Sequence, residues 1–166
     1  MLDVQNLSIV YNRVRPFVPA AMDISLTLSA GESLGIIGES GCGKTTLALG
    51  IMGLLRQAEI RGRVLFQERN LTAMKASRRR LFRWRHIAMV FQNSLEVFNP
   101  VTTLGEQLAE PLRTHLGLSP KAARERMAEM LTLTGLDPQW HTGYAHQLSG
   151  GMRQRALIAM ALGCEP

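Results

Sequence analysis

Short apolar runs mark the first half of the chain and predict β-strands. Residues 2–11 and 20–28 alternate partly between apolar and polar side chains, as strands with one buried face do. Residues 33–37 (SLGII) form a continuous apolar run, which predicts a strand buried on both faces, and residues 87–91 form another. Residues 63–66 predict one more short strand. This half is therefore expected to form a sheet.

Helical signals interrupt these strands and dominate after residue 92. A helix is predicted over residues 44–55 and a short one around Arg80. Thr103 and Glu106 have the spacing of a capping box, in which the threonine hydroxyl accepts from the Glu106 amide and the glutamate reaches back. The helix that this box opens should be kinked or ended by Pro111.

Two further helices follow. Ser119 and Pro120 form an N-cap and an N1 proline, and Gly135 is placed to end the helix that they start. A last helix is predicted over about residues 151–162. The apolar stripes of these two helices are expected to face inward; they comprise Ala123, Met127, Met130 and Leu131, and then Ala156, Leu157, Met160 and Ala161.

A glycine-rich loop lies between the apolar run 33–37 and the helix predicted from residue 44. It matches the phosphate-binding pattern G-x-x-x-x-G-K-[ST] at every fixed position, with the residues Gly38, Glu39, Ser40, Gly41, Cys42, Gly43, Lys44 and Thr45. Glycines let backbone N–H groups converge on a phosphate, and the following helix directs its positive end there. Lys44 would add a cation and Thr45 a hydroxyl ligand for Mg²⁺. A chance match in a simple turn is the alternative, which the flanking strand and helix disfavour. Cys42 is either a small filler residue or, beside Lys44, a reactive thiol.

A second motif, LSGGMRQR, begins at residue 148. Ser149, Gly150 and Gly151 stand at the start of the last predicted helix, where a hydroxyl and two glycine amides can bind an anion. The simpler interpretation is that Ser149 is only an N-cap.

The two motifs together resemble those of ABC-type ATPases, whose signature is LSGGQ, and the stretch YAHQLSGGMRQRALIAMAL is similar to that family throughout. Met152 replaces the signature glutamine, as is common in the peptide-importer branch. The stretches GESGCGKTTLALGIMGLL and FQNSLEVFNP are most similar to oligopeptide, dipeptide and nickel importers. Those importers usually have Gln-Asp-Pro where this chain has Gln92, Asn93 and Ser94.

The resemblance implies an α/β fold: a P-loop NTPase of the ABC type, with a mixed sheet core and an inserted helical subdomain. Residues 1–166 would form one incomplete nucleotide-binding domain, with a strand-rich core (1–92), a helical subdomain (93–147) and the signature helix (148–166). The cofactors implied are ATP and Mg²⁺.

The resemblance also assigns roles to residues. Tyr11 would stack on adenine, Thr46 would join the phosphate loop, and Gln92 would contact Mg²⁺ and the attacking water, so that Thr45 and Gln92 form the metal site. Ser149, Gly150 and Gly151 would close over the γ-phosphate held by a second subunit, in a head-to-tail dimer. Taken alone, Gln92 could be a surface residue and Tyr11 a residue that covers the core.

The resemblance covers the first two-thirds or so of such a domain. The Walker B aspartate, the catalytic glutamate and the switch histidine would follow Pro166, and none of the four histidines (His86, His115, His141 and His146) is in a suitable segment. We therefore expect a fragment or a truncated product that binds ATP without hydrolysing it, with no catalytic residue of its own. The missing strand should leave apolar edges exposed next to residues 33–37.

Composition narrows the cellular setting. The 46% hydrophobic content excludes a disordered chain, and no apolar run approaches the length of a membrane span. The N-terminus does not resemble a signal peptide, and two cysteines make no disulfide framework, which fits a reducing cytosol. Membrane association at the cytoplasmic face is therefore expected to come through a partner.

The net charge of +6 raises the question of a polyanionic ligand. Much of the excess lies in the stretch SRRRLFRWRH, residues 77–86, which is either a polyanion-binding patch or a short helix with a solvated basic face. No nucleic-acid-binding motif accompanies it, so no nucleic acid is expected.

The leading functional hypothesis is an energy-coupling subunit that pairs with a second ATP-binding subunit and drives permease subunits, importing peptides, nickel or a similar small solute. A soluble ABC ATPase without a permease and a non-hydrolysing nucleotide-binding module are the alternatives. The solute itself is not encoded in these residues, because its contacts belong to the permease and its binding protein.

Overall fold

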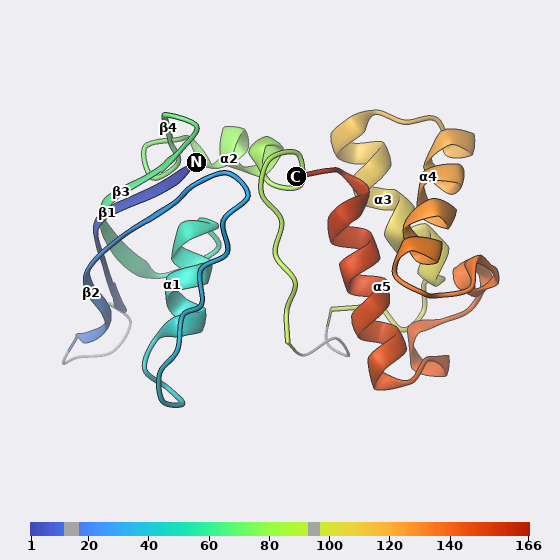
Figure 1. Ribbon diagram of the computed structural model, residues 1–166, viewed down its shortest axis with the longest axis horizontal. Helices are drawn as coiled ribbons and strands as arrows, with labels where there is room; N and C mark the ends of the chain where they lie inside the picture. Colours follow the sequence, from blue (N-terminus) through green and yellow to red (C-terminus); the bar gives the residue numbers. More distant parts are fainter. Residues whose placement is uncertain (12–16, 93–96) are drawn as a thin grey trace. The chain divides into compact units, whose positions relative to one another are not determined.

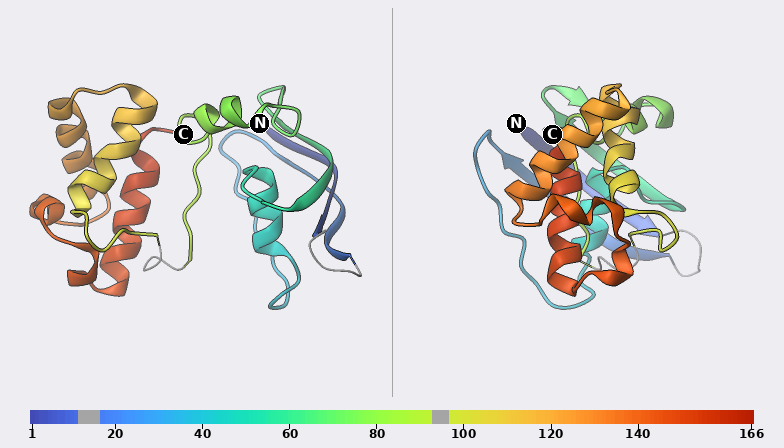
Figure 2. Two further views of the ribbon diagram at one scale, coloured as in Figure 1. Left: turned by 180° about the vertical axis from the view of Figure 1, so that it is seen from behind. Right: turned by 90° about the vertical axis from the view of Figure 1, so that its right-hand side faces the viewer.

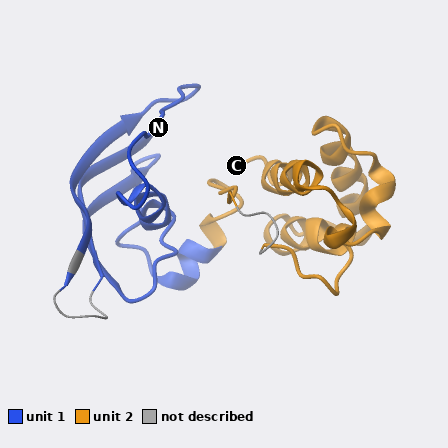
Figure 3. Cartoon of the chain, turned by 90° about the horizontal axis from the view of Figure 1, so that it is seen from below, with its two compact units in different colours: residues 1–80 blue, residues 81–166 orange. Residues whose placement is uncertain are grey.

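The computed structural model describes residues 1–11, 17–92 and 97–166 (Figure 1). The chain forms two compact units, Met1–Arg80 and Leu81–Pro166, and the boundary falls inside helix α2 (Ala76–Phe82) (Figure 3). Each unit is described by itself. The sequence-based division at residues 92 and 147 remains a prediction.

The first unit is built on an antiparallel sheet in the order β2-β1-β3-β4, which Figure 2 shows from two sides. The strands are β1 (Leu2–Tyr11), β2 (Val18–Leu28), β3 (Ala58–Phe66) and β4 (Arg69–Asn70). The predicted strand 2–11 is confirmed, and the strand predicted over 63–66 is the end of the longer β3.

The partial alternation of β1 has a structural cause. The buried side chains of β1 are Val4, Leu7 and Ile9, which are three and then two residues apart along the strand. The register of β1 against both neighbours shifts between these residues, and Asn6 has a φ of 49°. An extra residue in a strand produces this change of phase. Across from it Gly62 has a φ of 92°, and a Cβ there would lie 2.3 Å from the Asn6 carbonyl oxygen.

Helix α1 (Lys44–Ile51) packs against β1 and β2. A Cβ on Gly50 would lie 2.4 Å from the Ile9 Cδ1, so this glycine permits the close approach of helix and sheet. The helix is shorter than the predicted 44–55, and that prediction was wrong at its end. Gly53 has a φ of 62°, and the Leu54 amide bonds back to the Leu49 carbonyl, which ends the helix as a glycine-containing C-cap does.

Two predicted strands do not form. Residues 33–37 have no regular structure, and the Ile37 side chain is 95% exposed. Residues 87–91 contain only one isolated bridge, from Ile87 to Arg83. A run that is apolar on both faces becomes a strand only when other strands pair with it, and none of the described residues pairs with 33–37. Leu34 and Ile36 in the same run are exposed as well.

The second unit is a helical bundle of α3 (Leu104–Leu116), α4 (Pro120–Leu133) and α5 (Gly150–Gly163) with two short 3₁₀ segments, η1 (Pro138–Thr142) and η2 (Ala145–Gln147). The capping box of Thr103 and Glu106, the Ser119 N-cap and the Gly135 stop are confirmed. The predicted stripe of α4 lies in the bundle core, as do Ala156 and Leu157 of α5. Met160 is partly buried against this core, and Ala161 is buried.

Pro111 does not end α3, contrary to one of the two outcomes predicted for it. The proline removes one backbone hydrogen bond, yet the helix continues for another turn to Leu116. Pro111 is buried, as are Leu108 and Leu112 on the face that packs against α4 and α5. Tertiary packing therefore outweighs the lost hydrogen bond. Among the described helices none has the length and apolarity needed to cross a membrane.

Candidate nucleotide-binding site

The phosphate-binding loop runs directly into α1. Gly43 is the N-cap of the helix, with φ 97° and ψ 4°, and a Cβ at this position would lie 2.1 Å from the Ala20 carbonyl oxygen of β2. Gly41 also has a positive φ, of 84°. Both the backbone conformation and the contact with β2 therefore require a glycine at residue 43.

The N-terminus of α1 is open to a ligand. Gly43 provides no side-chain cap, so the first amides of the helix have no partner from the N-cap residue. Residues 38–42 are exposed. Uncapped amides at the positive end of a helix form a site for an anion such as phosphate.

Lys44 folds back over its own loop. Its Nζ donates to the carbonyl oxygens of Gly38, at 2.8 Å, and Glu39, at 2.6 Å, and lies 3.5 Å from the Cys42 Sγ. The cation is thus held on the loop by neutral carbonyl oxygens. Phosphate oxygens carry negative charge, so they can replace these carbonyls and form stronger bonds with the ammonium.

Tyr11 and Thr46 come together in the first unit. The Tyr11 hydroxyl, at the end of β1, is 3.3 Å from the Thr46 hydroxyl in the first turn of α1. The structure therefore brings the predicted adenine-stacking residue close to the phosphate loop. Thr45 is exposed on the same turn, and its hydroxyl is the kind of hard oxygen ligand that Mg²⁺ prefers.

The signature motif forms the N-terminus of α5 in the second unit. The Ser149 hydroxyl accepts from the Met152 amide at 3.3 Å, so Ser149 is an N-cap. Gly150 and Gly151 are exposed. Arg153 holds the preceding turn, because its guanidinium donates to the Leu148 carbonyl at 2.5 Å. Capping and anion binding are compatible here, because the glycine amides remain accessible.

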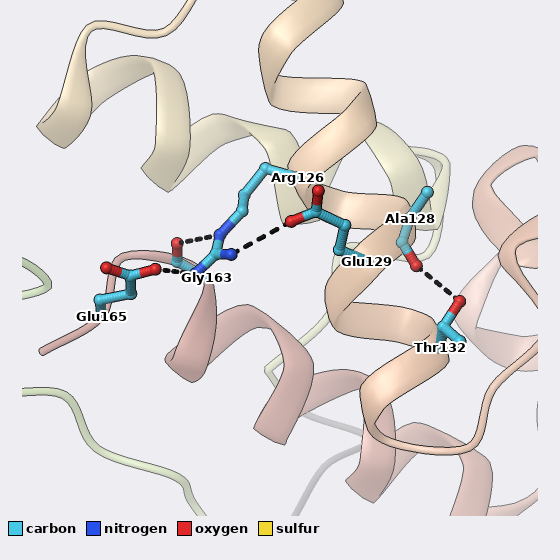
Figure 4. A network of polar contacts seen from close by, with 6 residues as sticks. All are labelled: Arg126, Ala128, Glu129, Thr132, Gly163 and Glu165. Atoms are coloured by element: carbon cyan, nitrogen blue, oxygen red, sulfur yellow. Dashed lines mark hydrogen bonds and ion pairs between the residues drawn. The ribbon is translucent and has the colours of Figure 1, made fainter.

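The opposite end of α5 is tied to α4 by Arg126, a residue that the sequence reasoning missed (Figure 4). Its Nε donates to the Gly163 carbonyl at 3.2 Å, and its two terminal nitrogens contact Glu129 and Glu165. A guanidinium at the C-terminus of a helix satisfies a free carbonyl and opposes the negative end of the dipole. Gly163 and Glu165 lie 37 and 39 residues away from Arg126, so no local pattern could have indicated these contacts.

Gln92, the other predicted metal-contacting residue, is exposed and belongs to the second unit. Asn93 and Ser94 lie outside the described residues. Throughout the described ranges there is no cluster of His, Cys, Asp or Glu that could hold a metal ion.

The sequence of residues 21–166 matches the profile of a protein family described as ABC transporter. The chain belongs to this family. Among the curated ABC proteins, it is 43% identical to the dipeptide transport ATP-binding protein DppD of Bacillus subtilis (strain 168), a match that covers the whole chain and 51% of that protein. It is 41% identical to the glutathione import ATP-binding protein GsiA of Salmonella typhimurium, of which it covers 28%.

Solved structures of ABC cassettes have the same fold. One of them is the dimeric post-hydrolysis state of the ATP-binding cassette MJ0796, bound to ADP and Pi. The match covers all of the present chain and 71% of the MJ0796 chain, with a TM-score of 0.89 and 27% identity. CbiO1 from Clostridium perfringens matches 99% of the chain and 62% of its own, with a TM-score of 0.76 and 25% identity. The predicted fold class, an ABC-type P-loop NTPase, is confirmed. The chain spans about half the length of its first curated relatives.

Proposed function

We propose that this chain binds MgATP through residues 38–46 and acts as the energy-coupling part of an ABC importer for peptides or a similar small solute. The observation that carries the proposal is the phosphate loop itself: an exposed glycine loop, an uncapped helix N-terminus and Lys44 folded back over the loop. The names of the relatives, which include dipeptide, oligopeptide and glutathione import proteins, support the importer assignment.

Each group of the loop has a distinct task in this proposal. The amides of residues 41–46 hold the phosphates, and Lys44 exchanges the carbonyls of Gly38 and Glu39 for phosphate oxygens. The Tyr11 ring offers a surface for adenine. Mg²⁺, when bound, neutralises phosphate charge, and Thr45 is the loop residue with a suitable ligand, to which Gln92 would add an amide oxygen.

Partners follow from the same proposal. A second ATP-binding subunit would place its own phosphates against Ser149, Gly150 and Gly151, and the MJ0796 cassette is described as dimeric. Permease subunits would dock on the helical unit and hold the chain at the cytoplasmic face of the membrane. An open hollow of about 340 Å³ beside α3, α4 and η1, with Arg113, Arg124 and Met127 in its lining, is a suitable recess for such a contact. Co-purification with an integral membrane protein would separate this function from that of a soluble ABC ATPase.

Calorimetric titration with a non-hydrolysable ATP analogue tests the binding site. Lys44→Ala removes the lysine ammonium from the loop, and a charge-assisted hydrogen bond contributes about 1.5–3 kcal/mol, so affinity should fall by at least about tenfold. Lys121→Ala, at an exposed lysine of α4, is the matched control and should leave affinity unchanged. Equal affinity for the Lys44→Ala variant and the parent would contradict the assignment of this loop.

A further inference from the structure

The basic charge of the chain is concentrated in one stretch of the first unit. Residues 56–80 contain eight of the 19 lysines and arginines and two of the 13 acidic residues. The remaining 11 basic and 11 acidic residues cancel, so this stretch accounts for the entire net charge of +6. Such a concentration creates a local positive potential that a neutral remainder does not oppose.

Most of these cations have no partner. Arg61 pairs with Glu59, and Arg79 donates to the Met74 carbonyl. The others are exposed, and within the described part of the chain none has a hydrogen bond or ion pair through its side chain; they are Arg56, Arg63, Arg69, Lys75, Arg78 and Arg80. Their charge is therefore available to a ligand.

Four of the cations gather around β4 and the start of α2, and we name Arg69, Lys75, Arg78 and Arg80 the β4–α2 patch. Asn70, Lys75 and Arg78 line one open hollow of about 520 Å³, and Arg69 precedes Asn70 in β4. In Figure 1, β4 and the start of α2 both lie at the upper edge of the first unit. On α2, Arg79 is partly buried, whereas Arg78 and Arg80 are exposed.

We propose that the β4–α2 patch binds the surface of a membrane that contains anionic phospholipids. The patch has unpaired cations on long side chains, and it has neither a deep pocket nor an exposed aromatic ring. It therefore suits the diffuse negative charge of lipid headgroups better than a single-stranded nucleic acid, whose bases stack on aromatic rings. The proposal rests on the proposed function in one respect: a permease would keep the chain next to such a surface.

Vesicle flotation of the full 166-residue chain tests the proposal. The chain should float with vesicles of phosphatidylcholine plus phosphatidylglycerol and not with phosphatidylcholine alone. Binding should weaken steeply between about 50 and 300 mM salt, because counterions screen the attraction. The triple variant Lys75→Glu, Arg78→Glu, Arg80→Glu should lose at least about tenfold in partition coefficient.

A matched control reverses the same number of exposed charges elsewhere. Arg113→Glu, Lys121→Glu, Arg124→Glu changes the net charge equally but lies on the helical unit, and it should lower binding by less than about threefold. Equal losses for both variants would overturn the proposal, because net charge alone would then explain binding. Failure to bind anionic vesicles at low salt, or equal binding to neutral vesicles, would overturn it as well.

Two further measurements separate this proposal from its alternatives. The first is binding of a single-stranded oligonucleotide. If the chain binds it more tightly than the vesicles, and the triple variant weakens that binding equally, the ligand of the patch is nucleic acid and not a lipid surface. Affinity for a fluorescent ATP analogue should be the same in the parent and both variants. Lipid binding in a parent chain that fails to bind the analogue would refute the proposed function and leave the lipid surface standing.

Discussion

Arg126 is the single side chain that ties the C-terminal end of α5 to α4, among the described contacts shown in Figure 4, and its removal should destabilise the helical unit. Arg126→Ala deletes the donor to the Gly163 carbonyl and the two contacts with carboxylates. Thr132, on the same helix, bonds only back to the Ala128 carbonyl and takes no part in this tie. The loss therefore falls on the junction of α4 and α5.

The expected magnitude comes mainly from one hydrogen bond. A bond from a charged donor to the Gly163 carbonyl contributes about 1.5–3 kcal/mol. The side chains of Glu129 and Glu165 are 63% and 77% exposed, so each ion pair is screened and adds about 0–1 kcal/mol. Arg126→Ala should thus lower the free energy of unfolding by about 2–3 kcal/mol, and Glu165→Gln by less than about 1 kcal/mol.

Urea unfolding followed by tryptophan fluorescence measures this loss. Both tryptophans, Trp84 and Trp140, belong to the second unit, so the signal reports on it directly. Arg124→Ala, at an exposed arginine of the same helix, is the control and should cost less than about 0.5 kcal/mol. The reasoning fails if Arg126→Ala costs no more than this control. It also fails if Glu165→Gln costs as much as Arg126→Ala, since the ion pair would then carry the effect.

Three other predictions concern Gly43 and the two cysteines. Gly43→Ala should abolish nucleotide binding, measured by calorimetry, because the new Cβ would collide with the Ala20 carbonyl. Gly31 has a φ of 76°, but a Cβ there would meet nothing within 4 Å, so the control variant Gly31→Ala should bind nucleotide normally. MgATP should slow alkylation of exposed Cys42, and buried Cys164 should react slowly with or without it, as mass spectrometry can show; unchanged Cys42 labelling at saturating nucleotide would contradict its placement. Burial raises the pKa of the Cys164 thiol above its usual value of 9.0, partly offset by nearby arginines. The stability that the protonated thiol contributes should therefore be present below pH 9.0 and decline as pH rises above it. Cys164→Ala should flatten that decline in urea titrations. An equally steep decline in the variant would exclude the thiol as the cause.

Local signals in the sequence determined the features whose partners lie within a few residues. Thr103 and Ser119 cap their helices as predicted, because an N-cap hydroxyl needs only the amide three residues ahead. The glycine loop that precedes α1 was predictable for the same reason, since its glycines and the carbonyls that Lys44 contacts lie within eight consecutive residues; its binding of phosphate stays a prediction. The signature helix and the family followed from equally local motifs.

Tertiary structure alone decided the features that depend on distant partners. The apolar run 33–37 predicts a strand, but strand formation needs hydrogen-bonding neighbours, and the described residues supply none there. Pro111 stays inside α3 because packing on α4 and α5 compensates for its missing hydrogen bond. Arg126 reaches Gly163 only because two helices pack together, and Gly43 is required by a carbonyl of β2 as well as by its own loop. Periodicity and motif spacing describe a segment's own preferences, whereas these outcomes were set by contacts between segments.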